Sequence, residues 1–253
     1  MWWKINLIEE KLILIIHKFI QELNMKPNER ENKLYSDGKR IQIEREEQVM
    51  FDFLQQHSKG RDLYALDVGC ATGEISIELI NKGYKVKGID FSDVAIDICK
   101  NAGLDCYMSD VDEGIQEKDK TFDLVWAGDI VEHVFDPILL MKEVSRILKP
   151  GGVFLFSIPN DTHLMNRLRL FFGHSPQETI YKTLGQCKHH TFFSKSLITY
   201  MMNNANLSKC DVRYILKIPK TNYRCAIKRN WLNLFTYSMV IAAKKTMYSR
   251  IEK

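Results

Sequence analysis

An acidic turn that contains two glycines lies early in the sequence. Asp67 precedes Gly69, and Glu74 directly follows Gly73. Glycine lets a backbone approach a ligand closely, but carboxylates on both sides of the turn would repel a diphosphate at short range. The turn therefore predicts a site for a cationic ligand rather than for a pyrophosphate.

A second acid, Asp90, follows Gly73 at close to the roughly 20-residue distance at which a carboxylate accepts hydrogen bonds from ribose hydroxyls. The alternative role for Asp90 is the N-cap of the next helix, but Ser92 and Asp93 compete for that position. Phe91 is available to cover the base of a nucleotide. We therefore expect Asp90 to bind a ribose.

Asp110 and Val111 follow the third predicted strand and are candidates for the base-binding end of the same site. The Asp110 carboxylate can accept a hydrogen bond from the amino group of adenine, and Val111 can line the pocket. The alternative for Asp110 is a solvated loop acid.

From residue 63 onward, short apolar runs alternate with helical stretches, a pattern typical of repeated βα units and a parallel sheet. The acidic turn, Asp90 and Asp110 each follow a predicted strand, and open α/β sheets bind ligands at the carboxyl ends of their strands. A polar connector at 24–40 precedes a helix that begins near Ile41. The predicted strands are 63–68, 84–89, 105–108, 122–126, 153–158, 209–218 and 235–243, and the predicted helices 73–82, 93–102, 137–148 and 194–205.

The ordered motifs between residues 60 and 160 resemble those of class I S-adenosylmethionine-dependent methyltransferases. Within that class, the sequence is most similar to the small-molecule branch that includes the ubiquinone-biosynthesis O-methyltransferases. Residues 190–194 resemble the family more weakly. Ala71 stands where the family often has glycine. The motifs are Leu66–Gly73, Gly88–Ser92, Phe122–Val125, Asp129–Val134 and Leu148–Gly152.

The resemblance implies an α/β fold: a Rossmann-like three-layer sandwich with a seven-stranded, mostly parallel sheet whose last strand is antiparallel. Residues 1–60 are then expected to form N-terminal helices that act as a cap and connector. Residues 61–253 would form the methyltransferase domain, with a helical lid insertion at about 160–192. Pro150-Gly151-Gly152 is expected to turn the chain into the fifth strand.

The cofactor that the resemblance implies is S-adenosyl-L-methionine, whose sulfonium and α-ammonium match the cationic ligand predicted from the acidic turn. The implied reaction is an in-line transfer of its methyl group to a hydroxyl of a small molecule, with an amine as the second choice. The sequence does not identify the acceptor. The residues expected to bind the cofactor are Asp67, Gly69, Cys70, Ala71, Gly73, Asp90, Phe91, Asp110, Val111, Ala127 and Asp129.

Three histidines are candidates for the base that removes the proton of a hydroxyl acceptor. His133 follows the fourth strand beside Glu132, and the family places this pair at the floor of the acceptor pocket. His163 and His190 lie in or beside the predicted lid. The alternative for each is a structural or solvated histidine.

Charge and cysteine content limit the partners. The net charge of +4 over 253 residues is too small for a protein that binds nucleic acid through many phosphates. Six scattered cysteines without a C-x-x-C pair suit the reduced thiols of a cytoplasmic protein. Cys187–His190 is the one local Cys/His cluster, and we expect no metal site because matched further ligands are missing.

Two further stretches bear on localisation and on the acceptor. The segment from Trp3 to Leu23 predicts an amphipathic helix that is too short in apolar residues to span a membrane. It is expected to pack as a lid or cap, and peripheral contact with a membrane surface is the alternative. The basic stretch from Lys217 to Trp231 predicts a solvated hairpin loop or, alternatively, a site for an anionic or lipid-linked acceptor.

Two other functions compete with methyl transfer. An NAD(P)-dependent oxidoreductase shares the strand–turn–helix unit and the later acid, but it predicts a third loop glycine and no acid before the first. A non-catalytic module that binds S-adenosylmethionine would keep the fold without turnover. Binding of S-adenosylhomocysteine without NAD binding would exclude the first, and methyl transfer to any acceptor would exclude the second.

Overall fold

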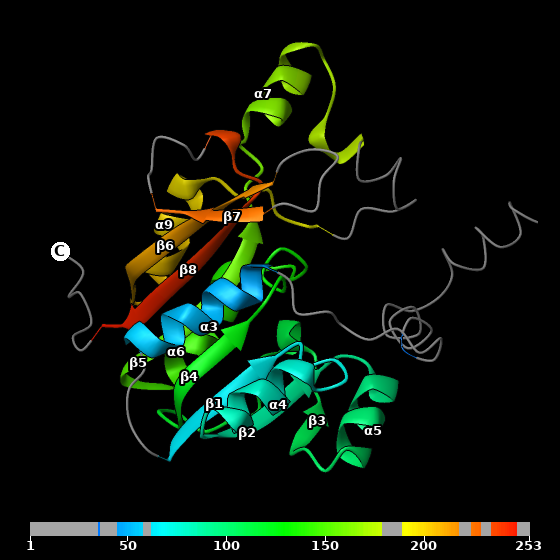
Figure 1. The fold of residues 1–253 in the computed structure, drawn as a ribbon, viewed down its shortest axis with the longest axis vertical. Coiled ribbons are helices and arrows are strands. Elements are labelled where there is room, and N and C mark those ends of the chain that lie inside the picture. The colour runs from blue at the N-terminus through cyan, green and yellow to red at the C-terminus, as the bar shows by residue number, and fades with distance from the viewer. Residues whose placement is uncertain are drawn as a thin grey trace, which may run out of the picture.

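The computed structural model describes Tyr35 and residues 45–57, 62–178, 189–217, 224–228 and 234–246. Within these residues, eight strands form one sheet in the order β3-β2-β1-β4-β5-β8-β6-β7 (Figure 1). The strands are β1 (Leu63–Val68), β2 (Tyr84–Asp90), β3 (Cys106–Met108), β4 (Phe122–Ala127), β5 (Leu148–Pro159), β6 (Leu207–Lys217), β7 (Arg224–Ile227) and β8 (Ser238–Lys245).

The sheet is mostly parallel, as the sequence predicts. Strands β3, β2, β1, β4 and β5 pair in parallel, and β8 lies antiparallel between β5 and β6. The predicted count of seven strands is wrong by one. The additional strand, β7, pairs antiparallel with β6 from Lys217↔Arg224 to Tyr214↔Ile227, inside the stretch expected to be a solvated hairpin loop. The strand has only four residues, too few for an alternating pattern that would predict it. Its extended conformation depends on pairing with β6.

Helices cover both faces and make a three-layer sandwich (Figure 1). α3 (Arg45–His57), α4 (Glu74–Asn81) and α5 (Asp93–Asn101) lie on one face, and α6 (Pro137–Ile147) and α9 (Lys195–Asn204) on the other. Ser92, Asp136 and Ser194 begin three of these helices by accepting hydrogen bonds from backbone N–H groups of the first turn. A short 3-10 helix, η1 (Val111–Glu113), follows β3.

Alternate residues of the central strands supply the two halves of the core. In β4, Leu124 and Trp126 pack toward α3 and α4, whereas Val125 and Ala127 pack toward α6 and α9. Burial on both faces explains why these parallel strands read as continuous apolar runs. Side chains of the core therefore fill both faces of the sheet. A ligand site is expected at the edge where the parallel strands end.

The fifth strand begins earlier than the sequence predicts. Pro150-Gly151-Gly152 belongs to β5 and forms an irregularity opposite Phe122 and Leu124, where the register shifts. A Cβ on Gly152 would lie 2.9 Å from the carbonyl oxygen of Lys149, so only glycine fits there. The predicted turn is thus a bulge within the strand.

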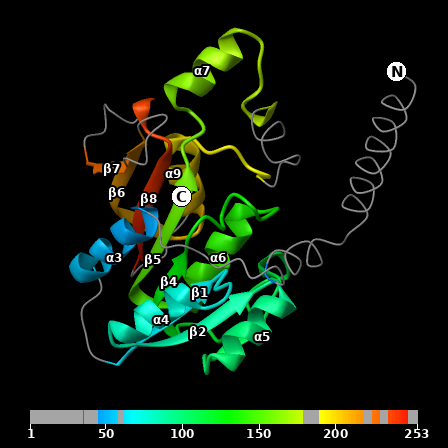
Figure 2. The same ribbon diagram turned by 45° about the vertical axis from the view of Figure 1, so that its right-hand side comes forward.

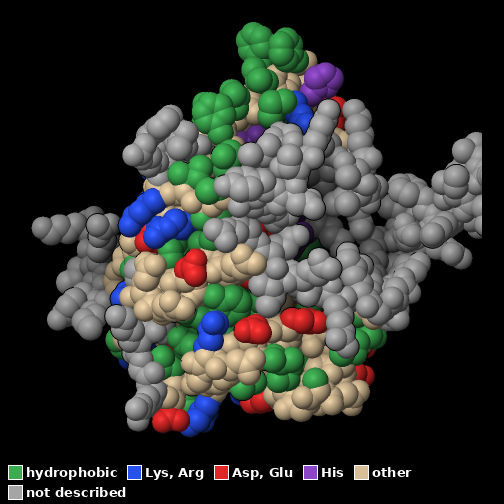
Figure 3. Space-filling model, viewed as in Figure 1, with side chains coloured by type: hydrophobic (Ala, Val, Ile, Leu, Met, Phe, Trp, Pro, Cys, Tyr) green, Lys and Arg blue, Asp and Glu red, His purple; other side chains and the backbone are tan. Residues whose placement is uncertain are grey.

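α7 (Leu164–Phe171) projects from the end of the sheet at which β5 ends (Figure 2). Its exposed apolar side chains gather at the far end of the molecule (Figure 3). They are Met165, Leu168, Leu170, Phe171 and the following Phe172. Within the described ranges, no helix has the length and apolar character needed to cross a membrane. The predicted N-terminal amphipathic helix lies outside the described residues.

Candidate active site

The carboxyl ends of β2, β1, β4 and β5 lie next to one another at one edge of the sheet, because these strands are parallel neighbours. Asp90 ends β2, Gly69 follows β1, Asp129 follows β4, and Asp161 follows β5. Four acidic or glycine-containing segments that are distant in sequence therefore meet at the edge where α/β sheets bind ligands.

The turn after β1 has a strained backbone that glycine makes possible. Gly69 and Gly73 have φ angles of +74° and +94°, and Ala71 has +47°. A Cβ on Gly69 would lie 2.2 Å from Cδ1 of Ile130, and one on Gly73 would lie 2.2 Å from Cδ1 of Leu104. Both glycines thus provide the left-handed conformation, and a Cβ at either position would force the side chain of Ile130 or Leu104 to move.

Asp90 holds this turn in place. Its Oδ2 accepts a hydrogen bond from the Ala71 N–H at 2.9 Å, and its Oδ1 accepts one from the Ser92 N–H at 2.8 Å. The N-cap of α5 is Ser92, whose hydroxyl accepts from the Ala95 N–H, so Asp90 does not have the competing role. A carboxylate has about four acceptor positions, and the two backbone bonds orient the group for further hydrogen-bond donors.

Asp67 lies deeper than a loop acid. Its side chain is 1% exposed and faces α4, where the Ser76 hydroxyl donates a hydrogen bond to Oδ2 at 2.7 Å. Burial raises the pKa of Asp67 to about 7, and the charges of Asp90 and Glu74 add to the rise. The potential in the turn is therefore negative, and a cationic ligand fits it. At neutral pH only part of that charge comes from Asp67.

The other predicted cofactor residues near β1 to β4 have mixed surroundings. Cys70 is buried and packs against Gly88, so its backbone rather than its side chain remains for a ligand. Asp110 caps η1 by accepting from the Asp112 N–H at 2.9 Å, and Val111 packs on the core. Ala127 is completely buried, whereas Phe91 is half-buried.

Asp129 has a constrained position after β4. Its φ angle is +51°, a conformation that is uncommon outside glycine. The Asp129 N–H donates to the Ser157 hydroxyl at 2.9 Å, and that hydroxyl donates to Asp129 Oδ1 at 2.6 Å. These bonds tie the end of β4 to β5 and fix the start of the segment that carries Glu132 and His133.

The structure brings His133 together with a histidine that the sequence did not single out as catalytic. The rings of His133 and His189 lie edge to face, with centroids 5.0 Å apart. The His190 N–H donates to the Glu132 carbonyl at 2.8 Å, which joins the two segments. The ring of His190 itself stacks on exposed Phe135. His163 lies elsewhere, buried at the start of α7 with its ring 4.7 Å from that of Tyr237.

Glu132 completes this cluster. It is 2% exposed, and its Oε2 has no hydrogen-bond partner among the described residues. Burial raises the pKa of Glu132 well above its usual value, and the carboxylates of Asp129 and Asp161 raise it further. Burial also lowers the pKa of His189, which favours its neutral form. The cluster therefore holds a buried acid beside two imidazoles.

Comparison with known protein families identifies the family of this chain. The model of the methyltransferase domain family matches residues 42–211. The chain belongs to this family. Its cofactor is S-adenosylmethionine, and the competing assignment as an NAD(P)-dependent oxidoreductase is excluded by the match.

Individual relatives of this methyltransferase agree with the family. The ubiquinone biosynthesis O-methyltransferase of Xanthomonas oryzae pv. oryzae is 26% identical over 212 residues, which cover 81% of this chain and 87% of the relative. A SAM-dependent methyltransferase of Methanosarcina mazei has a TM-score of 0.57 at 20% identity, covering 78% of this chain and 98% of that one.

A second solved structure, from Thermotoga maritima, is described as a possible histamine N-methyltransferase. It has a TM-score of 0.59 at 21% identity and covers 79% of this chain and 88% of that one. At such low identity, both structures support the fold of this methyltransferase and not the choice of acceptor.

The methyltransferase contains a set of side chains that could hold a metal ion. One ligand atom each from Glu132, His133 and His189 lies within 4.8 Å of the others. Two imidazoles and a carboxylate are donors that suit a divalent transition metal or zinc. From the sequence, Cys187–His190 is the one stretch that could be weighed as a metal site. His189 belongs to that stretch, Cys187 lies outside the described residues, and the other two ligands come from the segment after β4.

Proposed function

We propose that this S-adenosylmethionine-dependent methyltransferase transfers the methyl group to a hydroxyl of a small molecule, with an amine as the second choice. The main support for the proposal is the cluster of Glu132, His133 and His189. It lies at the same edge of the sheet as the glycine turn after β1. The similarity to O-methyltransferases supports a hydroxyl acceptor.

The cofactor supplies an electrophilic methyl group on a sulfonium, and the protein holds the cofactor and the acceptor in the required positions. Asp90, oriented by two backbone N–H groups, would accept hydrogen bonds from the ribose. The acidic surroundings of the turn would favour the cationic end of the cofactor. Holding donor and acceptor in line accounts for a large part of the acceleration in such displacements.

His133 would act on the acceptor hydroxyl in one of two ways. It could remove the proton itself, as a neutral imidazole does in general base catalysis. Alternatively, together with Glu132 and His189, it could bind a divalent cation that polarises the hydroxyl. The buried Oε2 of Glu132, which has no hydrogen-bond partner among the described residues, favours the second way, because a bound cation would compensate the charge of the ionised carboxylate.

The test of the cofactor assignment is calorimetric. Asp90→Ala is expected to weaken S-adenosylhomocysteine binding on the order of 100-fold, since hydrogen bonds to a charged group are lost. Asp90→Asn, which keeps one acceptor oxygen, should weaken S-adenosylhomocysteine binding less than Asp90→Ala does. Asp97→Ala, on the exposed side of α5, is the control and should bind as the wild type does. Unchanged affinity in a folded Asp90→Ala variant would contradict the assignment.

A further inference from the structure

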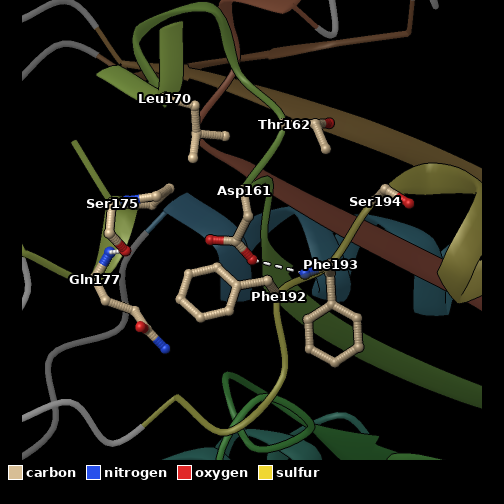
Figure 4. Close-up of a pocket in the computed structure, with 9 residues that line it drawn as sticks. Asp161, Thr162, Leu170, Ser175, Gln177, Phe192, Phe193 and Ser194 are labelled. Carbon is tan, nitrogen blue, oxygen red and sulfur yellow. Dashed lines mark hydrogen bonds between the residues drawn. The ribbon is translucent and has the colours of Figure 1, made fainter. Parts of the chain in front are cut away.

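A cavity of about 340 Å³ lies beyond the end of β5, between the start of the segment that leads into α7 and the segment before α9 (Figure 4). Its volume suits a single-ring compound, at the small end of ligand sites. The lining residues come from three stretches: the start of the segment after β5, which holds Asp161; residues within 170–177; and residues 192–194.

Asp161 is the one charged side chain among the described residues that line the cavity. Its Oδ2 accepts a hydrogen bond from the Phe193 N–H at 2.7 Å, which joins two walls. In Figure 4 the other oxygen points into the space between Ser175 and Phe192. No lysine, arginine or histidine of the described residues forms an ion pair with this carboxylate within 4.0 Å.

Among the described residues, this partly buried carboxylate has a backbone hydrogen bond but no cation that balances its charge, and a partly buried charge is costly unless it is compensated. Burial raises the pKa of Asp161 to about 6, which still leaves the group mainly ionised at neutral pH. A ligand that offers a hydrogen-bond donor or a positive charge would compensate this carboxylate, whereas an anion would be repelled.

The remaining walls suit an apolar body. Leu170, Pro176 and Phe192 contribute aliphatic and aromatic surface, and Figure 4 shows the ring of Phe192 beside the Asp161 carboxylate. A flat ring can pack against Phe192 while its substituent meets the acid. Asp161 also contributes to the field at Glu132, so the cavity and the Glu132–His133–His189 cluster are electrostatic neighbours.

We propose that this cavity binds the methyl acceptor and that Asp161 selects acceptors with a ring or other apolar body and a neutral or cationic hydrogen-bond donor, against anionic acceptors. The inference rests on the proposed function and names the chemical class of its substrate. It competes with the anionic acceptor suggested by the basic stretch around Lys217 and Arg224, which lies on β6 and β7.

Three probes that share one ring and differ in charge test the proposal: catechol, dopamine and protocatechuate. Their dissociation constants are measured by NMR titration on the full chain saturated with S-adenosylhomocysteine. The wild type should bind anionic protocatechuate more weakly than neutral catechol. In Asp161→Asn, the dissociation constant of protocatechuate divided by that of catechol should be about 10-fold lower than in the wild type, because one repelling charge at close range in a partly solvated site is removed. Asn keeps an acceptor for the Phe193 N–H. Asp97→Asn is the control and should leave the ratio unchanged.

Leu170→Lys provides a second variant, in which Asp161 itself is unchanged. Leu170 is 59% exposed, so the substitution is compatible with folding, and the added cation should strengthen protocatechuate binding selectively. Failure of the wild type to bind S-adenosylhomocysteine would contradict the proposed function itself. Normal S-adenosylhomocysteine binding would overturn the inference alone if the charge ratio is the same in Asp161→Asn and wild type. The absence of binding by all three probes at millimolar concentration would do the same.

Discussion

Replacing Asp67 by asparagine should change the pH dependence of stability. In the folded protein the pKa of this buried carboxyl is about 7, against 3.8 for an ordinary aspartate. The unfolded chain therefore releases the proton at lower pH than the folded chain. The stabilising effect of keeping the group protonated is complete below pH 4 and is lost as the pH rises through 7.

The size of the effect follows from the shift. Each pKa unit corresponds to about 1.4 kcal/mol, so wild type should lose about 2 to 3 kcal/mol between pH 5 and pH 8 from this group alone. Asp67→Asn does not titrate, and its amide oxygen can still accept the Ser76 hydrogen bond. The free energy of unfolding of the variant minus that of wild type should therefore become more positive by that amount over the same interval.

Urea unfolding of the cofactor-free protein at pH 5, 6, 7 and 8 measures this difference. Titrating groups that do not interact with Asp67, including Glu132 and Asp161, act equally in both proteins and cancel. Asp97→Asn, which removes an exposed carboxylate of α5, is the control and should run parallel to wild type. If the curves of wild type and Asp67→Asn also run parallel, then Asp67 is ionised in the folded protein across this range, and burial does not raise its pKa to about 7.

Two further predictions concern the metal ligands and the turn. Treatment with a chelator should remove bound metal, measured by mass spectrometry, and abolish methyl transfer, and manganese or zinc should restore both. Glu132→Gln should lower metal affinity by 10-fold or more (about 1.4 kcal/mol). Full activity of the metal-free protein would instead leave His133 as the base. Gly69→Ala should lower the free energy of unfolding by about 3 kcal/mol, from left-handed strain and the 2.2 Å approach to Ile130. Gly103→Ala, which has φ +82° but open space, should cost only about 1 kcal/mol in the same urea experiment, and equal losses would show that packing against Ile130 is not the cause.

The sequence predicted the central elements well because local pattern and tertiary role agree there. β1 begins and ends at the predicted residues, and β2 differs by one residue at its end. The last four residues of β1 are all buried, and in β2 apolar or glycine positions alternate with polar ones, so both strands have a pattern with clear limits. β7 was missed because four residues at the edge of the sheet are ordered by pairing with β6, a contact that no local pattern encodes.

The candidate site was predictable only where its residues share one segment. The turn and Asp90 follow from spacing, since a strand, a glycine turn and the next strand form one βα unit. His189 and His133 come from segments far apart in sequence, and the sequence shows the Cys187–His190 stretch only as a local cluster without further ligands. Nothing in the spacing identifies which distant carboxylate or imidazole completes the set, because the packing of the segment before α9 decides it.

The location of Asp67 changes the reason why the turn accepts a cation. A loop acid would attract the cofactor directly, but Asp67 faces α4 and is near half-protonation at neutral pH, so the standing negative charge comes from Asp90 and Glu74. A sulfonium or ammonium placed at the turn would lower the pKa of Asp67 and drive off its proton. Binding of the cofactor is then coupled to proton release. The buried acid that destabilises the free protein above pH 7 would become a stabilising partner once the cationic cofactor is bound.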